Sequence, residues 1–183
     1  MQTLLGYFNK PLLKIPLSFG ILTGLLAFGY FLALYLMGVS PLGNIRTPDF
    51  GLHVIMACYA CWYYRKNYGG GWLHLWEGLT IGYVINMTAA FITGWLIYFF
   101  VVYYDPQVFV NYLNDMQSLL TERKAELVEQ IGEEEFQVLL AKVKENEPST
   151  LITDEISKKF MLGIIPILLV SLFFRKQKPN LPA

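Results

Sequence analysis

The stretch WLHLWEGLTIGYVINMTAAFITGWLIYFFVVYY, residues 72–104, contains one acidic residue, Glu77, and no lysine or arginine. A helix rises about 1.5 Å per residue, and about 20 apolar residues cross the hydrocarbon core of a bilayer. Residues 72–104 are therefore long enough to cross a membrane and to project beyond it at one end. This stretch predicts an all-α membrane protein.

The composition of the whole chain agrees with this prediction. Of its 183 residues, 55% are apolar and only 15% are charged, whereas soluble domains carry about 25% charged residues. The mean hydropathy is positive. Lysine and arginine form no basic patch, which argues against a nucleic-acid partner. We therefore expect the lipid bilayer to be the main surroundings of the chain.

Hydropathy divides the chain into four predicted transmembrane helices and one long connection. The predicted helices are residues 17–39, 48–64, 72–104 and 156–174. Residues 1–104 then hold an N-terminal tail and three crossings, residues 105–155 form the connection, and residues 156–183 hold the last crossing and a basic tail. Pro166 should bend the fourth helix, because proline lacks the backbone donor.

Lysine and arginine near the helix ends predict the orientation, because they gather on the cytoplasmic side. One side would carry Lys10, Lys14, Arg65, Lys66, Arg175, Lys176 and Lys178, and the other side Arg46, Lys158 and Lys159. Both termini are therefore expected in the cytoplasm, and residues 105–155 outside it.

The connection, residues 105–155, is acidic and helical in its pattern. It holds 12 acidic and four basic residues, and its apolar residues recur every three or four positions. The sequence GEEEF, residues 132–136, should end one helix and start the next. We expect an extracytoplasmic helical hairpin with one apolar face. This face either packs on itself, lies on the bilayer surface or docks another protein.

Glu77 and His74 form the first candidate polar group. They are three residues apart, so they share a helix face, and Glu77 is expected at the membrane interface near the helix start. It either anchors the helix there, paired with Arg65 or Lys66, or acts in proton or substrate handling. A lone H-x-x-E does not predict a metal site, because a di-iron bundle needs such motifs from two helices.

Small residues recur every fourth position after Glu77. They are Gly78, Gly82, Ala90 and Gly94, with Asn86 in the same row. Gly20 and Gly24 show the same spacing in the first predicted helix. Such spacing lets helix backbones approach closely in a membrane. We therefore expect the first and third helices to pack through these residues, with Asn86 hydrogen-bonded across the interface.

Two further motifs concern the second helix, residues 48–64. Asp49 and His53 lie four residues apart on one face near the outer surface, where Arg46 and Asp105 could join them. They form either a hydrogen-bonded closure of the bundle or a metal or proton site, although a zinc site needs at least three suitable ligands. Cys58 and Cys61 form C-x-x-C, but thiol relays need a second pair, so we expect buried small residues. The sequence predicts no metal site and no cofactor.

Three segments give the chain a resemblance to a known family. They are WEGLTIGYVINMTAAFITGWLIYFFVVYYDP, AELVEQIGEEEFQVLL and LLVSLFFRKQ. Together they resemble a bacterial family of four-helix inner-membrane proteins catalogued as a domain of unknown function. The resemblance implies an inner-membrane location and the same topology, with no established activity. It also suggests partners linked to the handling of lipid-linked sugars.

Two functions follow from these observations. The first is a non-catalytic membrane subunit or scaffold of a cell-envelope complex, which binds partners through the small-residue row and the acidic hairpin. The second is a small transporter or enzyme that uses Glu77 and His74, or Asp49 and His53. No nucleophile elbow, phosphate loop or H-E-x-x-H motif occurs in the sequence, which favours the non-catalytic function.

Overall fold

The computed structural model describes residues 10–43 and 46–177, and within these the chain is all-α as predicted. Its elements in chain order are α2 (Pro11–Leu36), α3 (Asp49–Asn67), α4 (Leu75–Phe99), the π-helix η2 (Phe100–Tyr104), α5 (Gln107–Glu122), α6 (Lys124–Ile131), α7 (Glu133–Lys144) and α8 (Thr150–Phe174).

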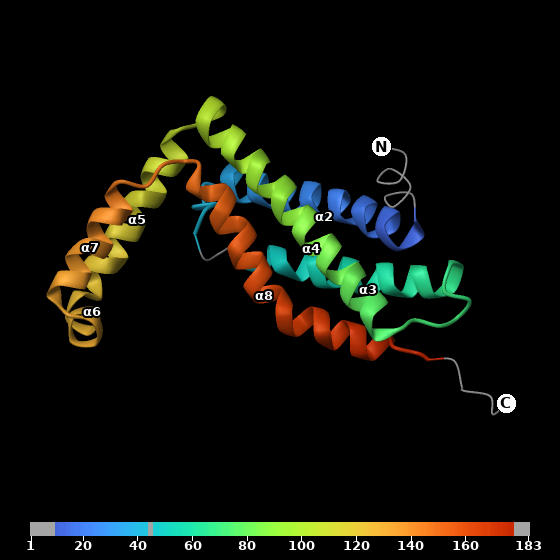
Figure 1. Ribbon diagram of the computed structural model, residues 1–183. Helices are drawn as coiled ribbons and strands as arrows, with labels where there is room; N and C mark the ends of the chain where they lie inside the picture. Colours follow the sequence, from blue (N-terminus) through green and yellow to red (C-terminus); the bar gives the residue numbers. More distant parts are fainter. Residues whose placement is uncertain (1–9, 44–45, 178–183) are drawn as a thin grey trace, which may run out of the picture.

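Helix α4 lies at the centre of a four-helix bundle and packs against α2, α3 and α8 (Figure 1). Helices α2 and α4 run in the same direction, because Gly20 faces Thr88 and Gly24, further along, faces Ile92. The Oγ1 atom of Thr93 also donates to the carbonyl oxygen of Gly24, at 3.1 Å. Helix α3 is therefore the segment that brings the chain back between two parallel helices.

Helix α8 runs antiparallel to α4. Gly82 of α4 faces Ile167, whereas Gly94, later in α4, faces Ile152 near the start of α8. Pro166 lies inside α8, and the helix changes direction part-way along its length (Figure 1). This agrees with the bend expected from a proline.

The row of small residues packs differently from the prediction. Gly20 and Gly24 do contact α4, but they meet Ile85, Thr88, Ala89 and Ile92 instead of the predicted row. The row itself faces α8, since Gly78 contacts Ser171 and Gly82 contacts Ile167. Helix α4 therefore uses two faces, one for each neighbour.

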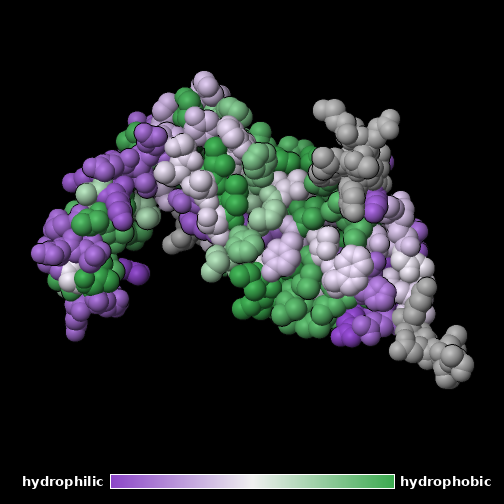
Figure 2. Space-filling model, in the orientation of Figure 1, coloured by the Kyte–Doolittle hydropathy of each residue, from purple (hydrophilic) through white to green (hydrophobic). Residues whose placement is uncertain are grey.

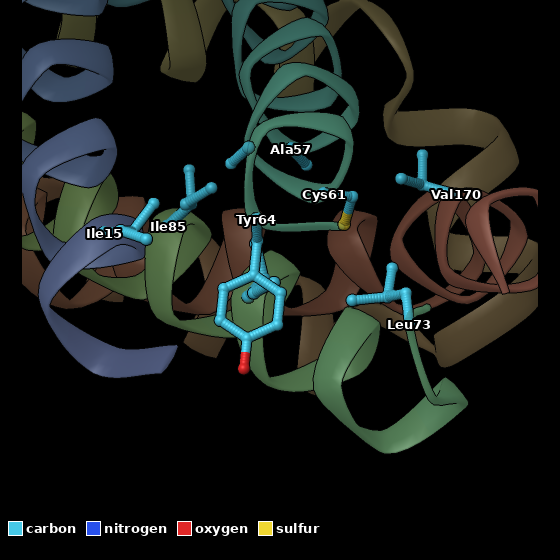
Figure 3. Close-up of a cluster of buried hydrophobic side chains, with 9 residues drawn as sticks. Ile15, Ala57, Cys61, Tyr64, Leu73, Ile85 and Val170 are labelled. Atoms are coloured by element: carbon cyan, nitrogen blue, oxygen red, sulfur yellow. The ribbon is translucent and has the colours of Figure 1, made fainter. Parts of the chain in front are cut away.

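The bundle has an apolar core at each end. One cluster joins all four bundle helices and Leu73, two positions before α4, and Figure 3 is a close-up of it. Its members are Ile15, Ala57, Ala60, Cys61, Tyr64, Leu73, Ile81, Ile85 and Val170. The second joins α2, η2, α5 and α8 through residues that include Phe31, Val101, Phe109 and Leu151. An antiparallel bridge between Leu73 and Lys176 ties the end of α8 to the start of α4.

Three helices are long and apolar enough to cross a membrane: α2, α4 with η2, and α8. Many of their large apolar side chains face outward, and Figure 2 shows apolar residues covering much of the visible face of the bundle. Helix α3 is not among the three. Its mean hydropathy is lowered by Asp49, His53, Arg65 and Lys66.

Helices α5, α6 and α7 form a projection that we call the arm. Helix α7 packs against α5 and α6, and the arm points away from the bundle (Figure 1). Gly132 separates α6 from α7 with φ of 86°, a conformation that glycine adopts without strain. The predicted break at GEEEF is confirmed, and the first turns of α5 are the part of the arm that joins the bundle core.

Candidate functional site

Four charged side chains meet inside the bundle, near the end from which the arm projects. Arg46 precedes α3, Asp49 begins α3, and Glu155 and Lys159 lie one turn apart in α8. Arg46 bonds to Asp49, Nε to Oδ2, at 3.1 Å, and its Nη2 atom also donates to Glu155. Lys159 donates to Asp49 and lies 3.9 Å from Oε1 of Glu155. The two positive and two negative charges balance.

This cluster is almost fully removed from solvent. The exposed fraction of the side chain is 13% for Arg46, 1% for Asp49, 6% for Glu155 and 5% for Lys159. Burying single charges costs several kcal/mol each, and only close pairing offsets that cost. The four residues therefore depend on one another for their burial.

His53 and Asn86 extend the polar cluster towards the middle of the bundle. The Nδ1 atom of His53 lies 2.8 Å from Oδ1 of Asn86, and Nδ2 of Asn86 donates to the carbonyl oxygen of Lys159 at 2.7 Å. Asn86 therefore links α3, α4 and α8, and it approaches α8 closely because Gly163 has no side chain there. A hydrogen bond of this kind between membrane helices contributes about 1 kcal/mol. Nε2 of His53 has no hydrogen-bond partner within the part of the chain described.

A cavity of about 290 Å³ lies beside the charged cluster. Its wall includes all four clustered residues, together with Tyr112 of the arm. The rest of the wall combines the apolar side chains of Leu42, Ile97, Leu151 and Leu162 with Gly43, Thr47, Asp154 and Lys158. The cavity thus combines buried charges with apolar surface, as small-molecule sites commonly do.

Burial shifts the titration of two groups at the cavity. It lowers the pKa of the Arg46 guanidinium, while Asp49 acts in the opposite direction; an arginine still stays protonated at neutral pH. Burial raises the pKa of the Tyr112 hydroxyl, and the nearby Asp154 raises it further. At neutral pH, Arg46 is therefore a cation and Tyr112 a neutral hydroxyl.

The family assignment rests on most of the chain. The sequence profile of a family described as "Protein of unknown function (DUF4199)" matches residues 18–176. The chain belongs to the DUF4199 family. No curated protein and no solved structure matches the chain.

In this DUF4199 protein, Asp49 and His53 meet one of the two partners considered in the sequence. Arg46 does join Asp49, but Asp105 lies elsewhere and accepts a hydrogen bond from the hydroxyl of Tyr35 at 2.9 Å. His53 bonds to Asn86. The two candidate residues are therefore part of a network across three helices.

Glu77 and His74 lie at the opposite end of α4 from the charged cluster. Oε2 of Glu77 accepts a hydrogen bond from the backbone nitrogen of His74 at 2.7 Å, and Oε1 accepts one from the hydroxyl of Tyr64 at 3.3 Å. A glutamate at this position satisfies an open backbone donor at the helix start. The carboxylate thus caps the start of α4 and, through Tyr64, links α3 to α4.

The two cysteines lie on α3, and both are free thiols. Cys61 is fully buried in the apolar cluster of the bundle, while Cys58 is partly buried. Within the described residues, no group of three or more histidine, cysteine, aspartate and glutamate side chains is arranged to hold a metal ion.

Sequence reasoning missed Glu155 and Lys159 as members of the charged cluster. The sequence places Glu155 in the outer connection and Lys159 at the membrane surface, because the predicted helix begins at residue 156. Helix α8 instead begins at Thr150. The available signal was the spacing of four between an acid and a lysine, combined with the small residue Gly163 four positions further on.

Proposed function

We propose that this protein is a non-catalytic integral membrane subunit of a bacterial cell-envelope complex, in which the arm binds a partner protein. The observation that carries the proposal is the position of the arm. Helix α7 packs on α5 and α6 and makes no extensive contact with the bundle helices that are described. The outer surface of the arm is therefore available to another molecule.

The surface of the arm supports a basic protein as the partner. The glutamates at positions 122, 126, 129, 133, 134 and 135 are all exposed, and Figure 2 shows the arm as predominantly hydrophilic. Among the described residues, the only ion pair within the arm joins Lys124 to Glu133. An anionic lipid surface would repel such a segment. The suggested link to proteins that handle lipid-linked sugars concerns this partner.

The proposal includes four membrane crossings: α2, α4 and α8, and in addition α3. Two neighbouring membrane helices that run in the same direction require the chain to cross back between them. Helices α2 and α4 have this relationship, and α3 is the element between them. The charges of α3 support the crossing, because Asp49 is neutralised inside the bundle and Arg65 and Lys66 lie in its last turn.

The distribution of lysine and arginine supports an inner-membrane orientation with both termini cytoplasmic. Arg65 donates to the carbonyl oxygen of Phe174 at 3.2 Å, so the basic ends of α3 and α8 lie together. The arm, residues 107–144, then lies on the extracytoplasmic side. The positive-inside rule favours this arrangement.

A transporter or enzyme at Asp49 and His53 is the second candidate, and the cavity beside Asp49 favours it. The other version of this candidate, at Glu77 and His74, is less favoured because the Glu77 carboxylate is used at the start of α4.

The decisive experiment replaces residues 121–147 by a short Gly/Ser linker in the full-length protein. We expect the bundle to insert and stay folded, while capture of the native partner by cross-linking in intact membranes is lost, together with complementation of a null strain. A control variant, Glu77→Gln with the arm intact, should retain both. Full complementation by the shortened protein would contradict the scaffold proposal and favour the second candidate.

A further inference from the structure

Glu155, at the wall of the cavity beside the charged cluster, has one oxygen without a donor. Oε1 of Glu155 is buried and makes no hydrogen bond among the described residues. Arg46 donates to the other oxygen of this carboxylate, and Nζ of Lys159 lies 3.9 Å from Oε1, which is too far for a hydrogen bond. Glu155 as a whole is only 5% exposed. An unmet buried carboxylate oxygen calls for an N–H or O–H donor.

The cavity is bordered by the surface that would face lipid. Leu162 of α8 lines the cavity and is 48% exposed. Its neighbours Met161 and Ile165 are 67% and 68% exposed, and α8 is one of the helices able to cross a membrane. A ligand that enters past Leu162 would therefore approach along an apolar helix face. This path suits an amphiphile whose chains stay in the bilayer.

The charges around the cavity favour a zwitterionic head group. Arg46, Lys158 and Lys159 carry positive charge, and Asp49, Asp154 and Glu155 carry negative charge. Because these charges balance, neither an anion nor a cation is favoured by the cavity as a whole. Lys158 is exposed at the wall and offers its ammonium to a phosphate, while Glu155 needs a donor.

From these observations we infer that the cavity binds the head group of a phospholipid with a primary ammonium, such as phosphatidylethanolamine. The ammonium donates to Oε1 of Glu155, and the phosphate lies towards Lys158. The cavity volume of about 290 Å³ accommodates a head group and not the acyl chains, which lie along α8. The inference rests on the membrane placement proposed above, but it does not depend on partner binding by the arm.

Lipids that differ only in the number of N–H donors test this assignment. The full-length protein, purified in mild detergent and stripped of lipid, is mixed with phosphatidylethanolamine, its N-methyl and N,N-dimethyl forms, phosphatidylcholine or phosphatidylglycerol. Phosphatidylethanolamine should raise the unfolding temperature by roughly 3 °C or more at a concentration well above its Kd. The shift should fall as donors are replaced by methyl groups and be absent with phosphatidylcholine. An equal shift with phosphatidylcholine would overturn the inference.

Two matched variants locate the site. Leu162→Trp places a large side chain at the cavity wall, and Leu169→Trp places the same side chain two helical turns away, on an exposed part of α8 that does not line the cavity. Both replace exposed leucines outside the charged cluster, so both should fold. The lipid-induced shift should be lost in Leu162→Trp and kept in Leu169→Trp. A wild-type shift in Leu162→Trp would show that the lipid binds elsewhere. Partner capture, measured in parallel, reports on the scaffold function separately.

Discussion

Lys159 of α8 donates to Asp49 of α3, across 110 positions of sequence, and the two side chains are only 5% and 1% exposed. Removing one member of a buried pair leaves an uncompensated charge, which typically costs about 3–5 kcal/mol. We expect Lys159→Met to lower the free energy of unfolding by an amount in this range. Unfolding in detergent, followed by circular dichroism, measures it.

The neighbouring Lys158 supplies the control, because it is exposed and forms no ion pair that the described structure contains. Lys158→Met should change stability by less than about 0.5 kcal/mol. Combining Lys159→Met with Asp49→Asn restores the charge balance of the cluster, so the double variant should be more stable than the sum of the single losses predicts. Strict additivity would show that the two residues act independently.

Gly82→Leu should separate α4 from α8. A Cβ atom at Gly82 would lie 2.5 Å from Cγ2 of Ile167, and overpacking of this kind costs about 1–3 kcal/mol. Gly29→Leu on α2 is the matched control, because nothing lies within 4 Å of a Cβ built there. Thermal unfolding of both variants in the same detergent makes the comparison. If both variants lose the same stability, the close packing of Gly82 against α8 is not the cause of the loss.

Glu77→Gln should lower stability by about 0.5–2 kcal/mol, as expected for weakening the hydrogen bonds at a helix start. It should still complement a null strain, because the role assigned to the carboxylate is structural. A variant that folds with wild-type stability but fails to complement would restore Glu77 as a functional residue. Glu122→Gln, on the exposed surface of the arm, controls for the loss of an acidic charge.

Four crossings predict a definite labelling pattern. Single cysteines at Met37, Ser118 and Gln177, introduced after Cys58 and Cys61 are replaced by alanine, all lie at exposed positions. In intact cells an impermeant thiol reagent should modify positions 37 and 118 and leave position 177 unmodified. Protection at position 37 together with labelling at position 118 would mean that α3 does not cross the membrane.

Sequence patterns predicted the helices well because apolar residues dominate them locally. The predicted helix at residues 72–104 contains α4 and η2, and α6 ends just before Gly132 as expected. The pattern of small residues showed which face of α4 packs closely, but it could not show which helix lies against that face. Both α2 and α8 bring small residues to α4, so the choice depends on the shape of the whole bundle.

The charged cluster was only partly predictable for a similar reason. Asp49, His53 and Asn86 stood out because polar residues are rare in apolar helices. Glu155 and Lys159 follow an acidic connection and therefore resembled a solvated helix start. Their burial depends on Arg46 and Asp49, which arrive from 109 and 110 positions earlier in the chain. A local sequence pattern does not indicate contacts between residues so far apart in the chain.

The connection between α4 and α5 couples the arm mechanically to the bundle. The helix passes through η2 and reaches α5 after two residues, Asp105 and Pro106, and Asp105 is held by Tyr35 and by the backbone nitrogen of Gln107. This joint is short and bonded on both sides. A pull on the distal tip at α6 is therefore carried into α4, the helix on which the other three bundle helices pack, and not absorbed by slack chain.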